Sequence, residues 1–155
     1  MLSITILAVD TLKKPYWRQA AEVYLKRLRR EVKVRIIEVK AEAFGDRTRL
    51  RAVQKEGERL LNQLNKFPPS VFKAALSERG QEFSSLKLAE LMEKQFQPIV
   101  FVVGGSLGLN DQVLKECRLQ LALSRLTFPH ELARVILLEQ LYRAVTIMRG
   151  HKYHN

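Results

Sequence analysis

The chain has 155 residues, a length typical of one domain (residues 1–155) built around a single core. It is 46% hydrophobic and 28% charged, which argues against disorder and fibrous repeats. With 27 Lys and Arg against 16 Asp and Glu, the net charge of +11 favours a polyanionic partner, nucleic acid before an anionic membrane. One cysteine, Cys117, excludes an internal disulfide and a cysteine-rich zinc site. No membrane span or signal peptide is apparent, so we expect a cytoplasmic protein.

The first half of the chain alternates between strand and helix patterns. Residues 2–9 form a short apolar run typical of a buried strand, and Pro15 opens a helix with one apolar and one strongly basic face. Residues 32–36 alternate between apolar and basic side chains as a strand does, and residues 48–66 have a helical period. Residues 70–76 predict a third strand, with a loop over 77–81.

The second half repeats the alternation. Ser84 or Ser85 can cap a helix, and residues 99–103 are the clearest strand of the chain, an apolar run suited to burial on both faces. Asn110 can cap a short helix, residues 121–127 suit a final strand, and residues 131–149 predict the longest helix. We therefore expect an α/β fold with a mostly parallel sheet flanked by helices.

Parallel sheets bind ligands at the carboxyl ends of their strands, so the loops after Leu76, Val103 and Thr127 are the candidate pocket. The loop that carries Gly104, Gly105 and Gly108 would let a ligand approach the backbone closely. Its spacing matches neither the dinucleotide fingerprint nor the phosphate loop. A plain tight turn and a ligand loop are equally good interpretations of the glycines alone.

The C-terminal segment is basic and carries two histidines. His151 and His154 have the spacing of a metal pair, but no carboxylate follows Glu139 to complete a site, and we expect no metal. Glu139 and Arg143 have the spacing of an ordinary helical ion pair. The tail suits contact with an RNA base, while a solvated basic terminus is the plainer interpretation.

Four blocks of sequence together resemble the ribosomal RNA large subunit methyltransferase H family of the SPOUT class. The resemblance runs over essentially the whole chain, although Asp10 stands where the family commonly has a glycine. The blocks are Phe101-Val102-Val103-Gly104-Gly105-Ser106-Leu107-Gly108-Leu109, Leu123-Ser124-Arg125-Leu126-Thr127-Phe128-Pro129-His130, Leu138-Glu139-Gln140-Leu141-Tyr142-Arg143-Ala144 and Tyr153-His154.

This resemblance implies a homodimer that uses S-adenosylmethionine to methylate N3 of a pseudouridine in 23S rRNA, within the large subunit or the whole ribosome. It also implies a C-terminal trefoil knot around the cofactor. The cofactor-binding positions that it carries to this chain are Leu76, Gly104, Leu123, Ser124, Arg125, Leu126, Thr127 and Phe128.

The imide N3 of pseudouridine is a weak nucleophile until its proton leaves, so the reaction needs a base or a cation beside the imide. Arg143, Tyr153 and His154 are the candidate catalytic residues. In this hypothesis His154 or water takes the proton, Arg143 stabilises the developing charge and Tyr153 orients the base. A non-catalytic RNA- or ribosome-binding module is the main alternative. A small hydrolase built on His130 or His154 lacks any recognisable nucleophile motif.

Overall fold

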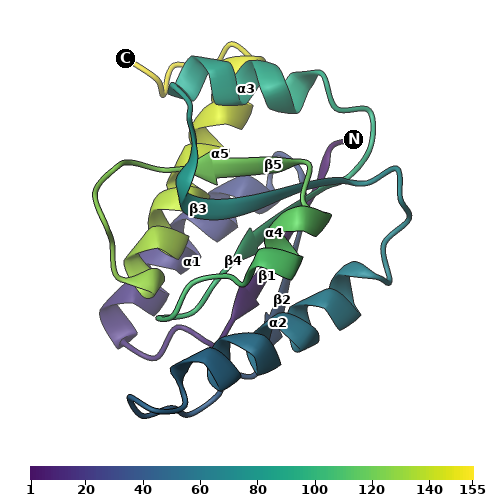
Figure 1. Ribbon diagram of the computed structural model, residues 1–155. Coiled ribbons are helices and arrows are strands. Elements are labelled where there is room, and N and C mark those ends of the chain that lie inside the picture. The colour runs from purple at the N-terminus through teal and green to yellow at the C-terminus, as the bar shows by residue number, and fades with distance from the viewer.

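A computed structural model describes all of residues 1–155 as five strands and five helices (Figure 1). The strands are β1 (Ser3–Val9), β2 (Lys33–Val39), β3 (Phe72–Glu82), β4 (Ile99–Val103) and β5 (Leu119–Ala122). The helices are α1 (Pro15–Arg29), α2 (Arg49–Leu64), α3 (Ser85–Glu93), α4 (Asp111–Glu116) and α5 (His130–Met148).

All five strands lie in one sheet in the order β2-β1-β4-β3-β5, and every neighbouring pair is parallel. The expected parallel α/β architecture is therefore confirmed. Because the strands all run in one direction, the segments that follow them leave the sheet at a common carboxyl edge. No helix is long and apolar enough to cross a membrane. The trefoil knot that the resemblance implies stays a prediction.

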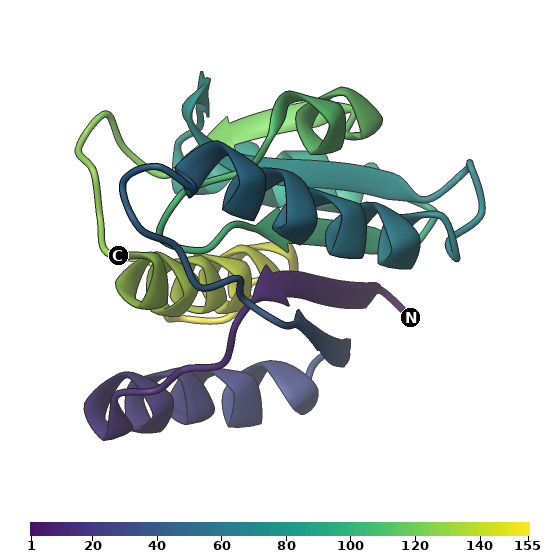
Figure 2. The same cartoon turned by 60° about the horizontal axis from the view of Figure 1, so that its bottom comes forward.

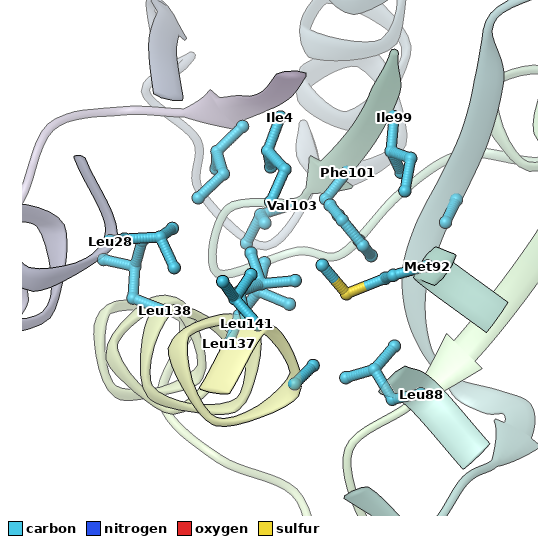
Figure 3. Close-up of a cluster of buried hydrophobic side chains, with 14 of the residues drawn as sticks. Ile4, Leu28, Leu88, Met92, Ile99, Phe101, Val103, Leu137, Leu138 and Leu141 are labelled. Carbon is cyan, nitrogen blue, oxygen red and sulfur yellow. The ribbon is translucent and has the colours of Figure 1, made fainter. Parts of the chain in front are cut away.

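Helices cover both faces of the sheet. Figure 2 shows α1 and α5 on one side and α2 on the other. Figure 3 shows sheet side chains such as Ile4 and Phe101 in the larger core, directed toward Leu28 of α1, Met92 of α3 and Leu138 of α5. A smaller core lies under α2 and α4 on the opposite face. Burial on both faces explains why β4 is a run of five buried apolar residues.

Two of the expected boundaries are wrong, and both lie beside the candidate pocket. The segment predicted as a loop over 77–81 belongs to β3, which continues to Glu82 through an irregularity in its pairing with β5. The strand predicted over 121–127 is β5, which ends at Ala122, so residues 123–128 form a loop. Apolar pattern alone does not reveal where two strands stop pairing, because pairing depends on the partner strand.

The start of α5 holds the segment that joins β1 to α1. Asp10 adopts a left-handed conformation with φ of 71°, which Asp tolerates better than most residues, at the position where the family commonly has glycine. The buried Arg134 donates hydrogen bonds to the carbonyls of Asp10 (2.6 Å) and Val9 (3.4 Å) and to the carboxylate of Glu38 (2.5 Å). One turn earlier, Glu131 accepts hydrogen bonds from the N–H groups at the start of α1.

Replacement of Arg134 by methionine is expected to destabilise the protein by about 3 kcal/mol, because two carbonyls and Glu38 lose a charged donor in a buried position. The change in the free energy of unfolding is measured by denaturant-induced unfolding. The control is Arg30→Met, which removes an exposed arginine that forms no ion pair. A loss no larger than that of the control would show that Arg134 does not hold this segment.

Candidate active site

A cavity of about 410 Å³ opens at the carboxyl edge of the sheet. Its walls come from β3 and its irregular segment, from the glycine loop after β4, from residues 121–128 and from the start of α5. Pockets of about 300–1,000 Å³ are typical of small-molecule sites. The rule for parallel sheets thus placed the pocket correctly.

The irregularity of β3 forms one wall of this pocket. Leu76 and Gln81 both pair with Leu121 of β5, so the four residues between them bulge out of the sheet. A Cβ on Gly80 would lie 2.6 Å from the backbone of Gln120, so glycine is needed for the close approach of β5. The bulge turns Glu78 and its neighbours toward the cavity.

The glycine loop forms the opposite wall. Gly105 and Gly108 bridge across the loop, and Gly108 has a φ of 76°, in the left-handed region that favours glycine. A Cβ on Gly104 would lie 2.8 Å from the backbone carbon of Gly108. Asn110 then caps α4 by accepting a hydrogen bond from the N–H of Val113 at 2.9 Å. The loop therefore presents bare backbone to the cavity.

Six of the eight expected cofactor residues line the cavity, namely Leu76, Gly104, Leu123, Ser124, Leu126 and Phe128. Arg125 and Thr127 are not in the lining. Arg125 pairs with Glu82 at 2.8 Å, and the hydroxyl of Thr127 donates a hydrogen bond to Glu78 at 2.9 Å. These two contacts fasten the 123–128 loop to β3, which is a structural role for both side chains.

Several lining residues are not among the cofactor positions that the resemblance implies. Glu78, Asp111 and His130 add polar groups to the cavity, and Leu107 and Leu109 add apolar surface on either side of Gly108. The parallel-sheet rule did indicate Glu78, which lies in the segment after Leu76, and His130 immediately follows the expected cofactor segment.

The expected catalytic residues gather elsewhere, at the far end of α5. The helix ends in a turn in which Gly150, with φ of 67°, and His151 donate backbone hydrogen bonds to the carbonyls of Ile147 and Thr146. This glycine turn reverses the chain. The tail therefore folds back along α5 instead of continuing into solvent.

Glu139 is the centre of the resulting cluster. Its Oε1 accepts hydrogen bonds from Nη2 of Arg143 at 2.6 Å and from the hydroxyl of Tyr153 at 3.2 Å. The Tyr153 ring packs edge-on against Tyr142, and the Arg143 guanidinium lies 4.8 Å from the Tyr153 ring centre. Nη1 of Arg143 lies 3.3 Å from Nδ1 of His154. The structure thus brings the three expected residues together and confirms the helical ion pair.

The pKa values of Arg143 and Tyr153 are shifted by the groups around them. Hydrogen bonding to Glu139 raises the pKa of Arg143, and burial together with the Glu139 charge raises the pKa of Tyr153. Arg143 is thus a permanent cation and Tyr153 a hydroxyl donor at neutral pH. Arginine has no acceptor, so Nδ1 of His154 accepts in this contact and the imidazole lone pair faces the guanidinium.

The cluster and the cavity are far apart within one chain. Ala133, in the first turn of α5, lines the cavity, whereas Arg143 lies ten residues further along the same helix, about 15 Å away at 1.5 Å per residue. No group of three or more His, Cys, Asp or Glu side chains is arranged to hold a metal ion.

A parallel α/β sheet with a glycine-lined pocket at its carboxyl edge defines a ligand-binding enzyme scaffold, and two solved structures share this fold. One is a probable methylase family protein from Haemophilus influenzae, 11% identical, with a TM-score of 0.59, covering 99% of this chain and 70% of that one. The other is a putative methyltransferase from Legionella pneumophila in complex with S-adenosylmethionine, 12% identical, with a TM-score of 0.54, covering 90% and 65%.

The family model described as "Predicted SPOUT methyltransferase" matches residues 2–154, so the chain belongs to the SPOUT methyltransferase family. Curated relatives agree over nearly their full length. The protein named "Ribosomal RNA large subunit methyltransferase H" from Pelotomaculum thermopropionicum is 42% identical, with 99% of each chain covered. Proteins of the same name from Oenococcus oeni and Caldicellulosiruptor saccharolyticus are 40% and 39% identical, covering 99% and 97% of this chain and 99% of each relative.

Proposed function

We propose that this chain transfers a methyl group from S-adenosylmethionine to N3 of a pseudouridine in 23S rRNA of the large ribosomal subunit. The observation that carries the proposal is the 42% identity, over nearly the whole of both chains, with a relative named for methylation of this RNA. The net charge of +11 supports an RNA substrate. Residues 1–155 act as one methyltransferase domain, in the cytoplasm where ribosomes are found.

The cavity at the carboxyl edge fits the cofactor. Leu76, Leu123 and Phe128 offer apolar surface for the adenine, and Glu78 offers a carboxylate for the hydroxyl or ammonium groups. Gly104 lets the backbone of Gly108 pack closely against it, because a Cβ there would lie 2.8 Å from the carbonyl carbon of Gly108. The bound cofactor supplies an electrophilic methyl group on a sulfonium. The chain has to hold that methyl in line with the acceptor nitrogen.

The cluster around Glu139 has the groups that the acceptor requires. Arg143 is a fixed cation that can stabilise the imide anion as the N3 proton leaves, and Glu139 and the Tyr153 ring hold its guanidinium in place. Tyr153 can orient the base, and water or His154 takes the proton. The imidazole becomes available for this step when the substrate displaces it from Arg143.

A separation of about 15 Å along α5, from Ala133 in the cavity wall to Arg143, keeps this guanidinium from acting on a methyl group in the cavity of its own chain. A homodimer resolves the difficulty if the cluster of one copy lies over the cavity of the other. An isologous two-fold dimer makes two equivalent sites in this way. Each active site then combines the cofactor pocket of one chain with Arg143, Tyr153 and His154 of a second copy.

The deciding experiment is transfer of labelled methyl from S-adenosylmethionine to ribosomes that lack the modification, followed by identification of the labelled nucleoside. We expect label in N3-methylpseudouridine and none in control ribosomes that carry uridine at the target position. If the protein binds the cofactor but no label appears on ribosomes, the proposed substrate is wrong. Absence of cofactor binding by calorimetry would favour the alternative of a non-catalytic RNA-binding module.

A further inference from the structure

A basic segment that follows β2 and includes the first turn of α2 has no role in the site described so far. Residues 43–51, here called the arginine arm, are exposed and include Arg47, Arg49 and Arg51. None of the three forms an ion pair within the chain. The nearby carboxylate of Glu42 pairs with Lys55 and Arg59 of α2. The arm therefore presents three cations to solvent.

The arginine arm also exposes apolar side chains among these cations. Leu50 is 88% exposed and Phe44 is 41% exposed. The guanidinium of Arg49 lies 5.5 Å from the centre of the Phe44 ring. Arginine planes and aromatic rings beside free cations are the groups on which unpaired RNA bases stack. Exposed apolar side chains grouped with unpaired cations are more typical of a binding surface than of a solvated helix face.

The arm is held in place at both ends. The N–H of Glu42 donates a hydrogen bond to Glu56 at 3.0 Å, and the carboxylate of Glu42 accepts from Arg59 at 2.6 Å. Within the arm, the N–H of Gly45 donates to the hydroxyl of Thr48 at 2.8 Å, and the arm's other end is the first turn of α2. A surface organised before binding loses less conformational entropy when a partner docks.

The arm leaves the sheet at the same carboxyl edge as the cofactor pocket, and Figure 1 shows it near the loop that follows β4. The buried Glu56 of α2 lies against that loop, since its unpartnered Oε1 is 3.6 Å from the position of a Cβ on Gly105. Arg49 lies seven residues earlier on α2, about 10 Å along the helix axis. The arm thus lies on the same edge of the sheet as the pocket, about 10 Å along α2 from the residue that packs against the glycine loop.

We propose that the arginine arm is an rRNA-docking surface that holds the substrate stem-loop over the cofactor pocket of the same chain. Arg47 and Arg51 contact backbone phosphates, and an unpaired base stacks on Phe44 and Arg49. This proposal rests on the proposed function, because it assumes an RNA substrate. It assigns RNA contact to the chain that holds the cofactor, whereas the Arg143 cluster comes from the second copy.

The test compares two triple variants of equal charge. One replaces Arg47, Arg49 and Arg51 by glutamine, and the matched control replaces Lys33, Lys87 and Lys94, exposed lysines away from the carboxyl edge, by glutamine. Binding to large subunits and kcat/KM for ribosomes are measured over a range of salt concentrations. We expect the arm variant to lose about 10- to 100-fold in kcat/KM through KM, with a salt slope lower by about 1.5 to 2 for the two lost phosphate contacts of Arg47 and Arg51.

Phe44→Ala separates stacking from charge. It is expected to weaken ribosome binding about 5- to 100-fold without changing the salt slope, because a base loses its stacking partner while the phosphate contacts remain. Cofactor affinity, measured by calorimetry, should stay at the wild-type value in all variants. Binding and salt slopes equal to those of the lysine control would overturn the proposal.

Two other outcomes are informative in different ways. If the arm variant sediments as a smaller species than the wild type, the arm joins copies of the chain, and its assignment to RNA is wrong. If the wild type binds cofactor and large subunits but methylates neither ribosomes nor subunits, the proposed function fails. The difference in subunit binding between the two triple variants still decides whether the arm docks RNA.

Discussion

Replacement of Arg143 by alanine is expected to lower kcat for methyl transfer about 100- to 1,000-fold, the usual cost of removing a cation or donor that meets a developing anion. Cofactor affinity should not change, because Arg143 lies outside the pocket lining. The fold should persist, since Glu139 keeps its hydrogen bonds from Gln140 and Tyr153. Single-turnover methylation of ribosomes together with calorimetry of cofactor binding measures both effects.

The control for this prediction is Arg35→Ala, which removes an exposed arginine from β2 without touching the cluster. A kcat for Arg143→Ala within fivefold of that control would mean that the guanidinium does not stabilise the imide. Arg143→Lys keeps the charge but loses the fork that Glu139 holds, so it should recover only part of the activity.

Mixed dimers test the two-chain site directly. When Arg143→Ala and Gly104→Ala chains are unfolded and refolded together, half of the dimers contain one of each, and one of the two sites in such a dimer is intact. At a cofactor concentration that fills the wild-type pocket but not the Gly104→Ala pocket, the mixture should therefore recover about a quarter of wild-type activity, although each variant alone has little activity under these conditions. A mixture as inactive as its components would place the whole active site within one chain.

Replacement of Gly104 by alanine is expected to weaken binding of S-adenosylmethionine about 10- to 100-fold. The added Cβ would lie 2.8 Å from the carbon and 3.0 Å from the oxygen of Gly108, both backbone atoms that cannot yield without moving the loop. Overpacking of this kind costs about 1–3 kcal/mol, and each 1.4 kcal/mol is tenfold in affinity. Isothermal calorimetry measures the change.

Gly45→Ala is the matched control for Gly104, because no atom lies within 4 Å of its Cβ position. It should leave cofactor affinity unchanged. Thermal unfolding of both variants distinguishes a local shift of the loop from a loss of fold. Wild-type affinity in a folded Gly104→Ala chain would show that the glycine loop does not contact the cofactor, and the pocket would need another occupant.

Much of the fold was predictable because each element carries a local signal. Pro15 begins α1, Ser84 and Asn110 cap α3 and α4, and Gly150 ends α5, as their backbone preferences require. The buried run of β4 was predicted to the residue. The ends of β3 and β5 were not, because their irregular pairing is a property of two strands and not of either sequence.

The candidate site, like the fold, was predictable from the sequence only in part. The rule for parallel sheets indicated the glycine loop, the resemblance implied residues 123–128, and the structure brings both to one cavity. The sequence did not indicate that Arg125 and Thr127 would fasten that loop to β3 instead of facing the cavity. Side-chain direction in an irregular loop depends on the partner across the gap, which lies some 45 residues away in the chain.

The sequence by itself determined the parallel α/β class, the positions of most elements and the resemblance that names the methyl donor, because these depend on local periodicity, capping and short blocks of residues. Only the tertiary structure decided that Glu139 would gather Arg143, Tyr153 and His154 at the end of α5 opposite the pocket. The physical reason is the regular geometry of α5, which places Arg143 about 15 Å along the helix from Ala133 in the cavity wall.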